Sequence, residues 1–314
     1  MKTLKKIGKI SLITLLTIIS VFLVIFGGFN ALKFAIYRDY YNIEQDLCKN
    51  PGLNDGFVCQ GICAVEEESK ILVSGYMKDH SPSRIYVTDL NNNSYFVEIS
   101  FNGKKYTGHG AGIARKDDRV FLVSENNLYI LLLSDILNAK KGDDVKALNK
   151  LALNNEGSFV YSDDNYLYIG EFHDGKKYVC KHVYNTPEGK NHAIICRYSF
   201  TDLTKPNAVY SIRDKVQGVC FSPDGKIILS TSYGLTSSVY YVYNQKDLID
   251  LKTTFDGAPV YALNNCTKQI KGPAMAEGLD YYNGKVITLT ESASNKYIFG
   301  KFFFATNIVS LDFN

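Results

Sequence analysis

Four polar residues of this 314-residue chain are each followed directly by glycine and then by a short apolar stretch. They are Gln60, Glu156, Gln217 and Glu277, and His109 stands in a comparable glycine-rich stretch that ends at Gly112. Carboxylate and amide oxygens suit a hard cation such as Ca²⁺, and they also hydrogen-bond polar ligands. Ordered water can satisfy the same groups in a purely structural role, so the sequence leaves both interpretations open.

Three further glutamates follow the second apolar stretch of a unit and form a secondary set: Glu125, Glu171 and Glu291. A glycoside hydrolase needs two carboxylates about 5–10 Å apart, and Glu156 and Glu277 are the candidates. Glu125 is a further candidate. The chain has no Trp, so the aromatic platform for a sugar would have to be Tyr or Phe. His109 is interpreted as a structural loop residue, with a general base as the alternative. The catalytic residues, and whether there is any catalysis, stay open.

The elements that would position these side chains repeat five times along the chain. The repeat begins at Gly61, Gly112, Gly157, Gly218 and Gly278, which are 45 to 61 residues apart. Each unit predicts a first strand, a turn, a second strand and a third strand, as in the segment 217–243. Fourth strands are weaker and are expected at residues 95–99, 151–153, 209–212 and 260–263.

Antiparallel four-stranded units at this period predict an all-β fold, a β-propeller. Five blades are favoured, and six are possible if the intervals of 61 and 60 residues hide an irregular blade. The last unit ends at its third strand, so a strand from residues 38–55 is expected to complete it and remove the open edge. In a propeller the first strands begin, and the second strands end, at one mouth of the central channel. The polar residues named above are therefore predicted to line that mouth.

The segment Val216–Lys226, with its Ser222-Pro-Asp-Gly225 turn, resembles the start of a blade in bacterial NHL, YncE-like and gluconolactonase/strictosidine-synthase-like propellers. The stretch from Glu277 to Tyr297 resembles the last blade of secreted propellers of Gram-positive bacteria. The resemblance covers roughly residues 56–314 and implies the fold, not the activity. Gluconolactonase-like propellers hold a cation in the channel with Glu, Asn and Asp. This chain offers Glu and Gln instead, which departs from that set and leaves Ca²⁺ as a minor expectation.

Seven cysteines are present, and Cys180 with Cys196 are the best candidates for a disulfide. They flank the turn at residues 185–189, so a hairpin there would place them opposite each other; two free thiols are the alternative. Further Cys or His ligands at short spacing are lacking beside Cys59 and Cys63, so a zinc–thiolate site is not expected. A weak metal site between His182 and His192, across the same turn, is the remaining suggestion.

The amino terminus carries four lysines within residues 1–9, and residues 10–32 run without a charge. This length suffices for a transmembrane helix. An uncleaved signal anchor is the favoured interpretation, with a cleaved signal peptide and a buried soluble helix as alternatives. The lysines place the amino terminus in the cytoplasm by the positive-inside rule, and the rest of the chain outside.

The formal charge of +3 argues against a strongly basic nucleic-acid-binding protein. Without residues 1–37 the remainder has 30 basic and 32 acidic residues, so no nucleic-acid partner is expected. The predicted domains are a cytoplasmic stub (1–9), a signal anchor (10–32), a linker with the ring-closing strand (33–55) and the propeller (56–314). The predicted role is a single-pass cell-membrane protein of Gram-positive type, whose extracellular propeller binds a small molecule or an extracellular protein at the channel mouth. The alternative is a cation-dependent, lactonase-like hydrolase.

Overall fold

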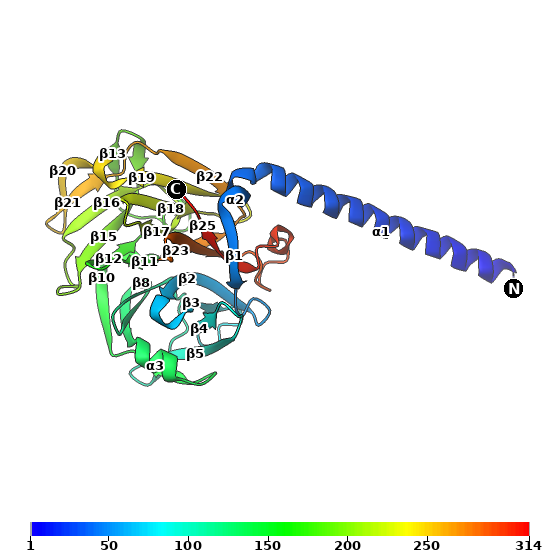
Figure 1. The fold of residues 1–314 in the computed structure, drawn as a ribbon, viewed down its shortest axis with the longest axis horizontal. Helices are drawn as coiled ribbons and strands as arrows, with labels where there is room; N and C mark the ends of the chain where they lie inside the picture. The colour runs from blue at the N-terminus through cyan, green and yellow to red at the C-terminus, as the bar shows by residue number, and fades with distance from the viewer. Residues whose placement is uncertain (1, 314) are drawn as a thin grey trace.

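The computed structural model describes residues 2–313, and it describes side chains from residue 11 onward. Five β-sheets surround one axis, so the predicted five-bladed propeller is confirmed (Figure 1). One inner strand from each blade faces the axis: β2 (Phe57–Val65), β7 (Gly112–Lys116), β11 (Phe159–Ser162), β17 (Val216–Phe221) and β23 (Ala276–Tyr282).

Four of the five repeat glycines let these inner strands approach one another. A Cβ built on Gly61 would lie 2.7 Å from the Cα of Gly112, and one on Gly112 would lie 2.6 Å from the backbone nitrogen of Val160. A Cβ on Gly218 would lie 2.8 Å from the nitrogen of Leu279, and one on Gly278 would lie 3.1 Å from the Cα of Gly61. The ring of inner strands therefore has no room for side chains at these positions.

The fifth glycine, Gly157, is not part of the ring, which corrects the prediction for blade three. It ends β10 (Asn149–Gly157), the outer strand of blade two, where it pairs with Glu125. The inner strand of blade three begins two residues later, at Phe159. The Glu156–Gly157 pair resembles the other starts in sequence, but tertiary pairing places it in the outer strand of blade two, two strands from the inner strand β7.

Blades one and two have irregular outer parts. Blade one continues from β2 through β3 (Lys70–Met77), β4 (Arg84–Asp89), β5 (Ser94–Phe101) and β6 (Lys104–Lys105), and β9 (Asp144–Lys146) pairs with β5. Blade two consists of β7, β8 (Arg119–Leu132) and β10. Strand β8 is interrupted at Glu125, which has a positive φ of 55°, so that its first part pairs with β7 and its second part with β10. A short helix, α3 (Leu133–Asn138), follows β8.

Two inserted hairpins, one here and one described in the next paragraph, account for the intervals of 61 and 60 residues between the repeat glycines of blades three and four. Blade three contains β11, β12 (Tyr166–Gly170), β15 (Ala193–Ser199) and β16 (Ala208–Ile212), with the hairpin β13 (Tyr184–Thr186) and β14 (Gly189–Asn191) inserted before β15. Blade four contains β17, β18 (Lys226–Thr231), β19 (Ser238–Asn244) and β22 (Lys268–Gly272), with η2 (Gln245–Asp247) after β19.

The prediction of residues 260–263 as the fourth strand of blade four is wrong. These residues lie in the hairpin of β20 (Ile249–Phe255) and β21 (Ala258–Ala262), and β21 pairs in parallel with β16 of blade three. Val260 is fully buried against Val209 and other apolar side chains there. The hairpin covers the outer edge of blade three, and an uncovered edge would invite pairing with another chain.

Blade five closes the ring as expected. It consists of β23, β24 (Lys285–Thr290), β25 (Asn307–Leu311) and β1 (Glu44–Lys49), which pairs with β25 from Glu44↔Leu311 to Lys49↔Asn307. The chain reaches β1 through α1 (Lys2–Ile36) and α2 (Arg38–Ile43). Helix α1 extends away from the propeller, beyond blade five (Figure 1).

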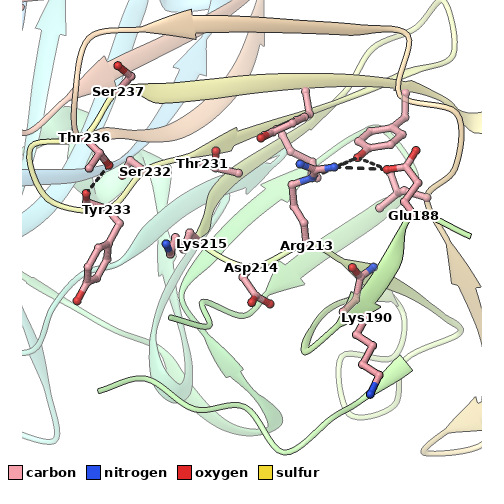
Figure 2. A pocket seen from close by; sticks show the side chains of 15 residues that line it. Glu188, Lys190, Arg213, Asp214, Lys215, Thr231, Ser232, Tyr233, Thr236 and Ser237 are labelled. Carbon is pink, nitrogen blue, oxygen red and sulfur yellow. Dashed lines mark hydrogen bonds and ion pairs between the residues drawn. The ribbon is translucent and has the colours of Figure 1, made fainter. Parts of the chain in front are cut away.

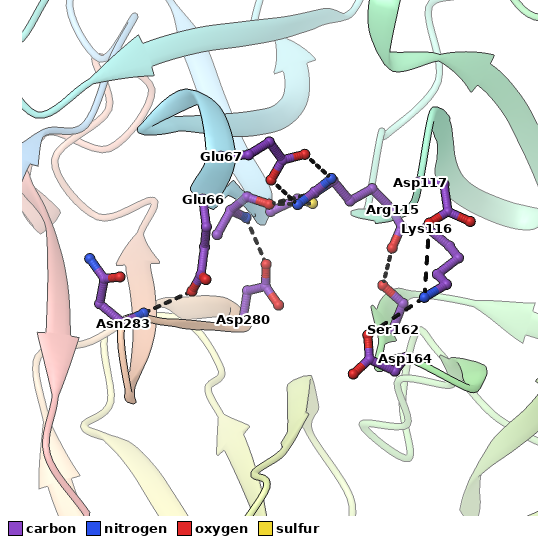
Figure 3. A network of polar contacts seen from close by, with 11 residues as sticks. Glu66, Glu67, Arg115, Lys116, Asp117, Ser162, Asp164, Asp280 and Asn283 are labelled. Atoms are coloured by element: carbon purple, nitrogen blue, oxygen red, sulfur yellow. Dashed lines mark hydrogen bonds and ion pairs between the residues drawn. The ribbon is translucent and has the colours of Figure 1, made fainter.

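A polar network ties the ends of four inner strands together on one face of the ring (Figure 3). The guanidinium of Arg115, at the end of β7, donates two hydrogen bonds of 2.6 Å to Glu67 in η1 (Glu66–Glu68) and one of 2.9 Å to the carbonyl of Ala64. Asp280 of β23 accepts the backbone N–H of Ala64 at 2.7 Å. Ser162 of β11 donates to the carbonyl of Arg115 at 2.6 Å. The network thus links blades five, one, two and three.

Candidate functional site

The opposite ends of the inner strands hold the predicted mouth residues. In three of these strands the pairing register shifts around one polar residue: between Cys59 and Gly61, between Val216 and Gly218, and between Ala276 and Leu279. A β-bulge takes a residue out of the regular ladder and re-aims its side chain. The bulges occur at Gln60, Gln217 and Glu277, and this shared irregularity is the local reason that these three side chains converge.

Each amide meets one carboxylate. Nε2 of Gln60 donates a 2.8 Å hydrogen bond to Oε2 of Glu291, which directly follows β24. Nε2 of Gln217 donates to Oε1 of Glu277 over a longer distance of 3.4 Å. Gln60 and Glu277 are only 6% and 3% exposed. Four residues from three blades therefore form two hydrogen-bonded pairs at the axis, and their two carboxyl groups are close enough to interact electrostatically.

The two carboxyl groups are difficult to ionise together. Burial raises the pKa of Glu277 well above its usual value, and the neighbouring charge of Glu291 raises it further. Burial also raises the pKa of Glu291 to about 7, against the opposing effects of Tyr297, Lys296 and Gln60. Ionisation of both carboxyl groups is therefore disfavoured near neutral pH, and while the pair holds one proton, one carboxyl can donate a hydrogen bond and the other can accept.

Aromatic and basic side chains form the rim of this cluster. The ring of His109 lies on that of Tyr76, with centroids 4.4 Å apart, and the ammonium of Lys296 lies 4.6 Å from the centroid of the Tyr76 ring. Tyr297 lies against both Tyr76 and Glu291. The side chain of His109 is exposed, but neighbouring protein atoms partly desolvate its ring. This desolvation, together with the charges of Lys296 and Lys177, lowers the pKa of His109 to about 4, so the ring is neutral at pH 7.

Three other predicted residues lie elsewhere. Glu125 and Glu156 are exposed, and Glu156 lies on β10, outside the ring of inner strands. Glu171 is buried beside blade three, where it pairs with His182 at 3.1 Å and accepts the backbone N–H of Ile194. The structure brings together Gln60, Gln217, Glu277 and Glu291, with His109 on the rim. A carboxylate pair of Glu156 and Glu277 is not formed.

The predicted disulfide between Cys180 and Cys196 is absent, because both thiols are free. The hairpin of β13 and β14 pairs only residues 184–186 with 189–191, so its register does not extend to the cysteines. Cys196, on β15, is buried in the core around Val209, whereas Cys180 belongs to the core around Tyr210 on the other side of blade three. Burial raises the pKa of both thiols, so they are poor nucleophiles.

A cavity of about 460 Å³, which no sequence pattern predicted, lies between blades three and four (Figure 2). Its wall combines basic and acidic side chains with hydroxyl groups: Glu188, Lys190, Arg213, Asp214, Lys215, Thr231, Ser232 and Thr236. Arg213 is held by the hydroxyl of Tyr243 at 2.9 Å and by Glu188 at 3.4 Å, and it stacks on Tyr241 at 3.5 Å. Since its guanidinium is already paired, the cavity is a polar cleft without one dominant charge.

Three possible metal ligands lie near this cavity. Nitrogen and oxygen atoms of His173, His192 and Asp214 lie within 4.8 Å of one another. However, Nδ1 of His173 accepts the backbone N–H of Cys180 at 3.0 Å, so the neutral ring carries its proton on Nε2. His192 bonds Asp214 at 3.1 Å and stacks on His173, so it does not face His182 across the hairpin as suggested. His173, His192 and Asp214 therefore support the loop after β12 through hydrogen bonds and stacking.

Comparison with known proteins identifies no family for the chain. No family model matches the chain, and no curated protein matches it. Among solved structures, the PQQ-bound aldose sugar dehydrogenase of Streptomyces coelicolor is 14% identical, with a TM-score of 0.45 over 79% of this chain and 77% of that chain.

Two further structures are similar at the same level. The WD40 β-propeller domain of Doa1 is 12% identical, with a TM-score of 0.43 over 78% of this chain and 79% of that chain. An oxidoreductase of Thermus thermophilus, described as a glucose dehydrogenase, is 10% identical, with a TM-score of 0.46 over 86% of this chain and 99% of that chain. The blades described above, and not these likenesses, establish that the chain is a β-propeller.

Proposed function

We propose that the protein is a membrane-anchored, extracellular binding module whose propeller takes a polar ligand, or a polar group of an extracellular protein, into the channel mouth. The observation that carries this proposal is the cluster of Gln60, Gln217, Glu277 and Glu291. Three bulged inner strands are needed to assemble it. Burying a carboxyl pair without opposite charges lowers the stability of the fold. Such pairs are typical of functional sites, where the cost in stability is accepted for binding or chemistry.

The anchor in this proposal is α1. Residues Ser11–Ile36 form a helix that is long and apolar enough to cross a membrane, and none of its most apolar stretch is buried against the propeller. The lysines that precede the apolar residues favour a cytoplasmic amino terminus. The propeller would then lie outside the cell. An uncleaved helix in the mature protein is what this proposal requires.

The chemistry of the mouth favours a ligand with several hydroxyl groups. The amides of Gln60 and Gln217 each offer a hydrogen-bond donor and an acceptor. The carboxyl pair also offers both while it holds one proton. The rings of Tyr76 and His109 add a flat, neutral surface on the rim. Hydroxyl groups can use donors and acceptors together, whereas an anion would meet the negative charge of the pair.

A cation-dependent hydrolase of the lactonase type is the second candidate. Two carboxylates and two amide oxygens fit a hard cation, and Oδ1 of Asn50, a buried neighbour of Cys59, has no hydrogen-bond partner among the described residues. When bound, a divalent cation would polarise a carbonyl group of a substrate. In this case Gln60 and Glu277 would act as ligands, and both carboxyl groups would have to be ionised.

Thermal unfolding of the full-length protein in detergent, with and without probe, distinguishes the candidates. Glucose and N-acetylglucosamine serve as hydroxylated probes and Ca²⁺ as the cation. The binding-module proposal predicts a higher Tm with a hydroxylated probe, and Gln217→Ala should abolish the increase. The control Lys190→Ala, in the neighbouring cavity, should keep it. An increase with Ca²⁺ alone, larger at higher pH, would favour the hydrolase, and an increase that Lys190→Ala removes would move the site to the cavity.

A further inference from the structure

The loop between β24 and β25 exposes an unusual group of large apolar side chains. Ile298 is 76% exposed and Phe299 is 69% exposed, and Phe302 and Phe304 are 39% and 45% exposed. The segment includes the short helix η3 (Gly300–Phe303). Single exposed apolar residues are normal on a protein surface, but four within seven residues form a contiguous segment that needs a partner.

This segment lies against the carboxyl-terminal part of α1, as Figure 1 shows for the red loop beside the end of the helix. The ring of Phe304 meets that of Phe26 edge-on at 5.3 Å, and Phe302 and Phe303 meet Phe29 at 6.2 and 6.1 Å. The ammonium of Lys33 donates a 3.0 Å hydrogen bond to the carbonyl of Phe303. The loop is therefore docked on the apolar part of the helix and not merely near it.

The contacts set the depth of the loop along the helix. Phe26 precedes Lys33 by seven residues, which corresponds to about 10 Å along a helix that rises 1.5 Å per residue. Lys33 marks the polar end of the apolar stretch. Amphipathic segments that lie in a membrane interface bury their apolar face by about 5–10 Å. The loop thus reaches the depth at which such segments sit.

The polar residues of the loop fit the same position. Lys296 precedes the apolar residues and Lys301 lies among them, and both lysines are exposed. Lysines at this level can bond lipid headgroups while their stems cover apolar surface. Lys296 and Tyr297 also belong to the rim of the channel mouth, so one loop connects the mouth to the apolar segment.

We propose that Ile298–Phe304 inserts into the outer leaflet of the bilayer that α1 spans, as a second membrane contact that holds the channel mouth next to the lipid surface. The inference rests on the proposed anchoring by α1. The partner is the lipid bilayer, because the loop continues the apolar surface of a helix that the same bilayer would surround. A second copy of the chain is the competing occupant.

The absence of Trp from the chain makes a direct test possible. The full-length variant Phe299→Trp carries a single tryptophan, and it is reconstituted in phosphatidylcholine–phosphatidylglycerol nanodiscs with or without brominated acyl chains, which quench tryptophan within the bilayer. Two matched variants report on other sites with similar exposure: Leu16→Trp in α1 and Leu148→Trp on blade two, whose native residues are 53% and 59% exposed.

We expect strong quenching for Leu16→Trp, clear but weaker quenching for Phe299→Trp, and none for Leu148→Trp. If Leu16→Trp is quenched and Phe299→Trp is not, the inserted loop is refuted while the anchor stands. If Leu16→Trp is not quenched, the anchoring itself fails. If the tryptophan of Phe299→Trp is shielded from solvent only in samples that analytical ultracentrifugation shows to be dimers, the loop is an interface between copies and the inference is wrong.

Discussion

Replacing Glu291 by Gln should make the propeller more stable at alkaline pH and leave it unchanged at acidic pH. The substitution keeps an acceptor for the 2.8 Å bond from Gln60 and removes the charge that competes with Glu277. Gln also has nearly the same shape as Glu. The variant therefore isolates the electrostatic effect of the carboxylate.

The magnitude follows from the pKa of Glu291, which rises from 4.5 to about 7 on folding. A raised pKa means that the folded state binds the proton more tightly than the unfolded state, so stability falls as pH rises from about 4.5 to about 7 and is then constant. The loss reaches at most about 3 kcal/mol, since each pKa unit corresponds to 1.36 kcal/mol. At pH about 8 the variant should gain up to this amount, an increase in Tm of about 6–12 °C.

The assay is thermal unfolding of the full-length protein in detergent, followed by circular dichroism at several pH values. Asp280, whose pKa burial also raises to about 7, contributes equally to both proteins, so the difference between them isolates Glu291. Asp280→Asn, which removes a half-buried carboxyl at the other face of the ring, should also become more stable at alkaline pH by the same reasoning. Equal Tm values at alkaline pH, or a variant that is less stable there, would show that the charge of Glu291 does not destabilise the folded state.

Three other experiments test the packing and the free thiols described above. Gly112→Ala should destabilise the propeller by about 3 kcal/mol in urea titration, because its Cβ would lie 2.6 Å from the backbone of blade three. The control Gly284→Ala, where the structure leaves open space, should lower the free energy of unfolding by only about 1 kcal/mol. Equal losses in the two variants would contradict the close approach. Arg115→Met should cost about 1–2 kcal/mol at low salt, since Glu67 is partly solvated, and a neutral result would mean that the inter-blade network adds nothing. Cys180 and Cys196 should both be alkylated after unfolding without reductant, and a peptide that links them by a disulfide would show that the free thiols are wrong.

The blade count was predictable because the axis imposes a physical restriction on sequence. Inner strands that approach within van der Waals contact at a glycine need that glycine in every blade where the contact occurs, so Gly61, Gly112, Gly218 and Gly278 recur in one context. Gly157 misled the prediction because it shares the local pattern and serves a different strand. Nothing within the segment itself distinguishes the two roles.

The β20–β21 hairpin was assigned to the wrong blade for a similar reason. Alternation of apolar and polar residues around Val260 predicts a strand, but the sheet that it joins depends on pairing with Val209, far away in sequence. Strand identity is a local property, whereas the choice of partner is set by which edge is open.

The site was only partly predictable. Gln60, Gln217 and Glu277 carry a signal, a polar residue before glycine, because the close approach of the inner strands requires that glycine next to the bulge that aims them. Tyr76, Lys296 and Tyr297 have no such signal, since they reach the mouth from a strand end and from a long loop. The cavity between blades three and four was missed because the inserted hairpin supplies part of its wall.

The site described here depends on two carboxyl groups at the axis, the buried Glu277 and the half-buried Glu291, that resist ionising together, and infrared difference spectroscopy of the full-length protein can test this property. At pH about 6, above the ordinary range of a glutamate, Glu277 should still show the carbonyl band of a protonated carboxyl group, because burial and Glu291 raise its pKa. Glu277→Gln should weaken that band, and Glu125→Gln, an exposed glutamate outside the cluster, should leave it unchanged. A wild-type spectrum without any protonated carboxyl group at that pH would contradict the claim.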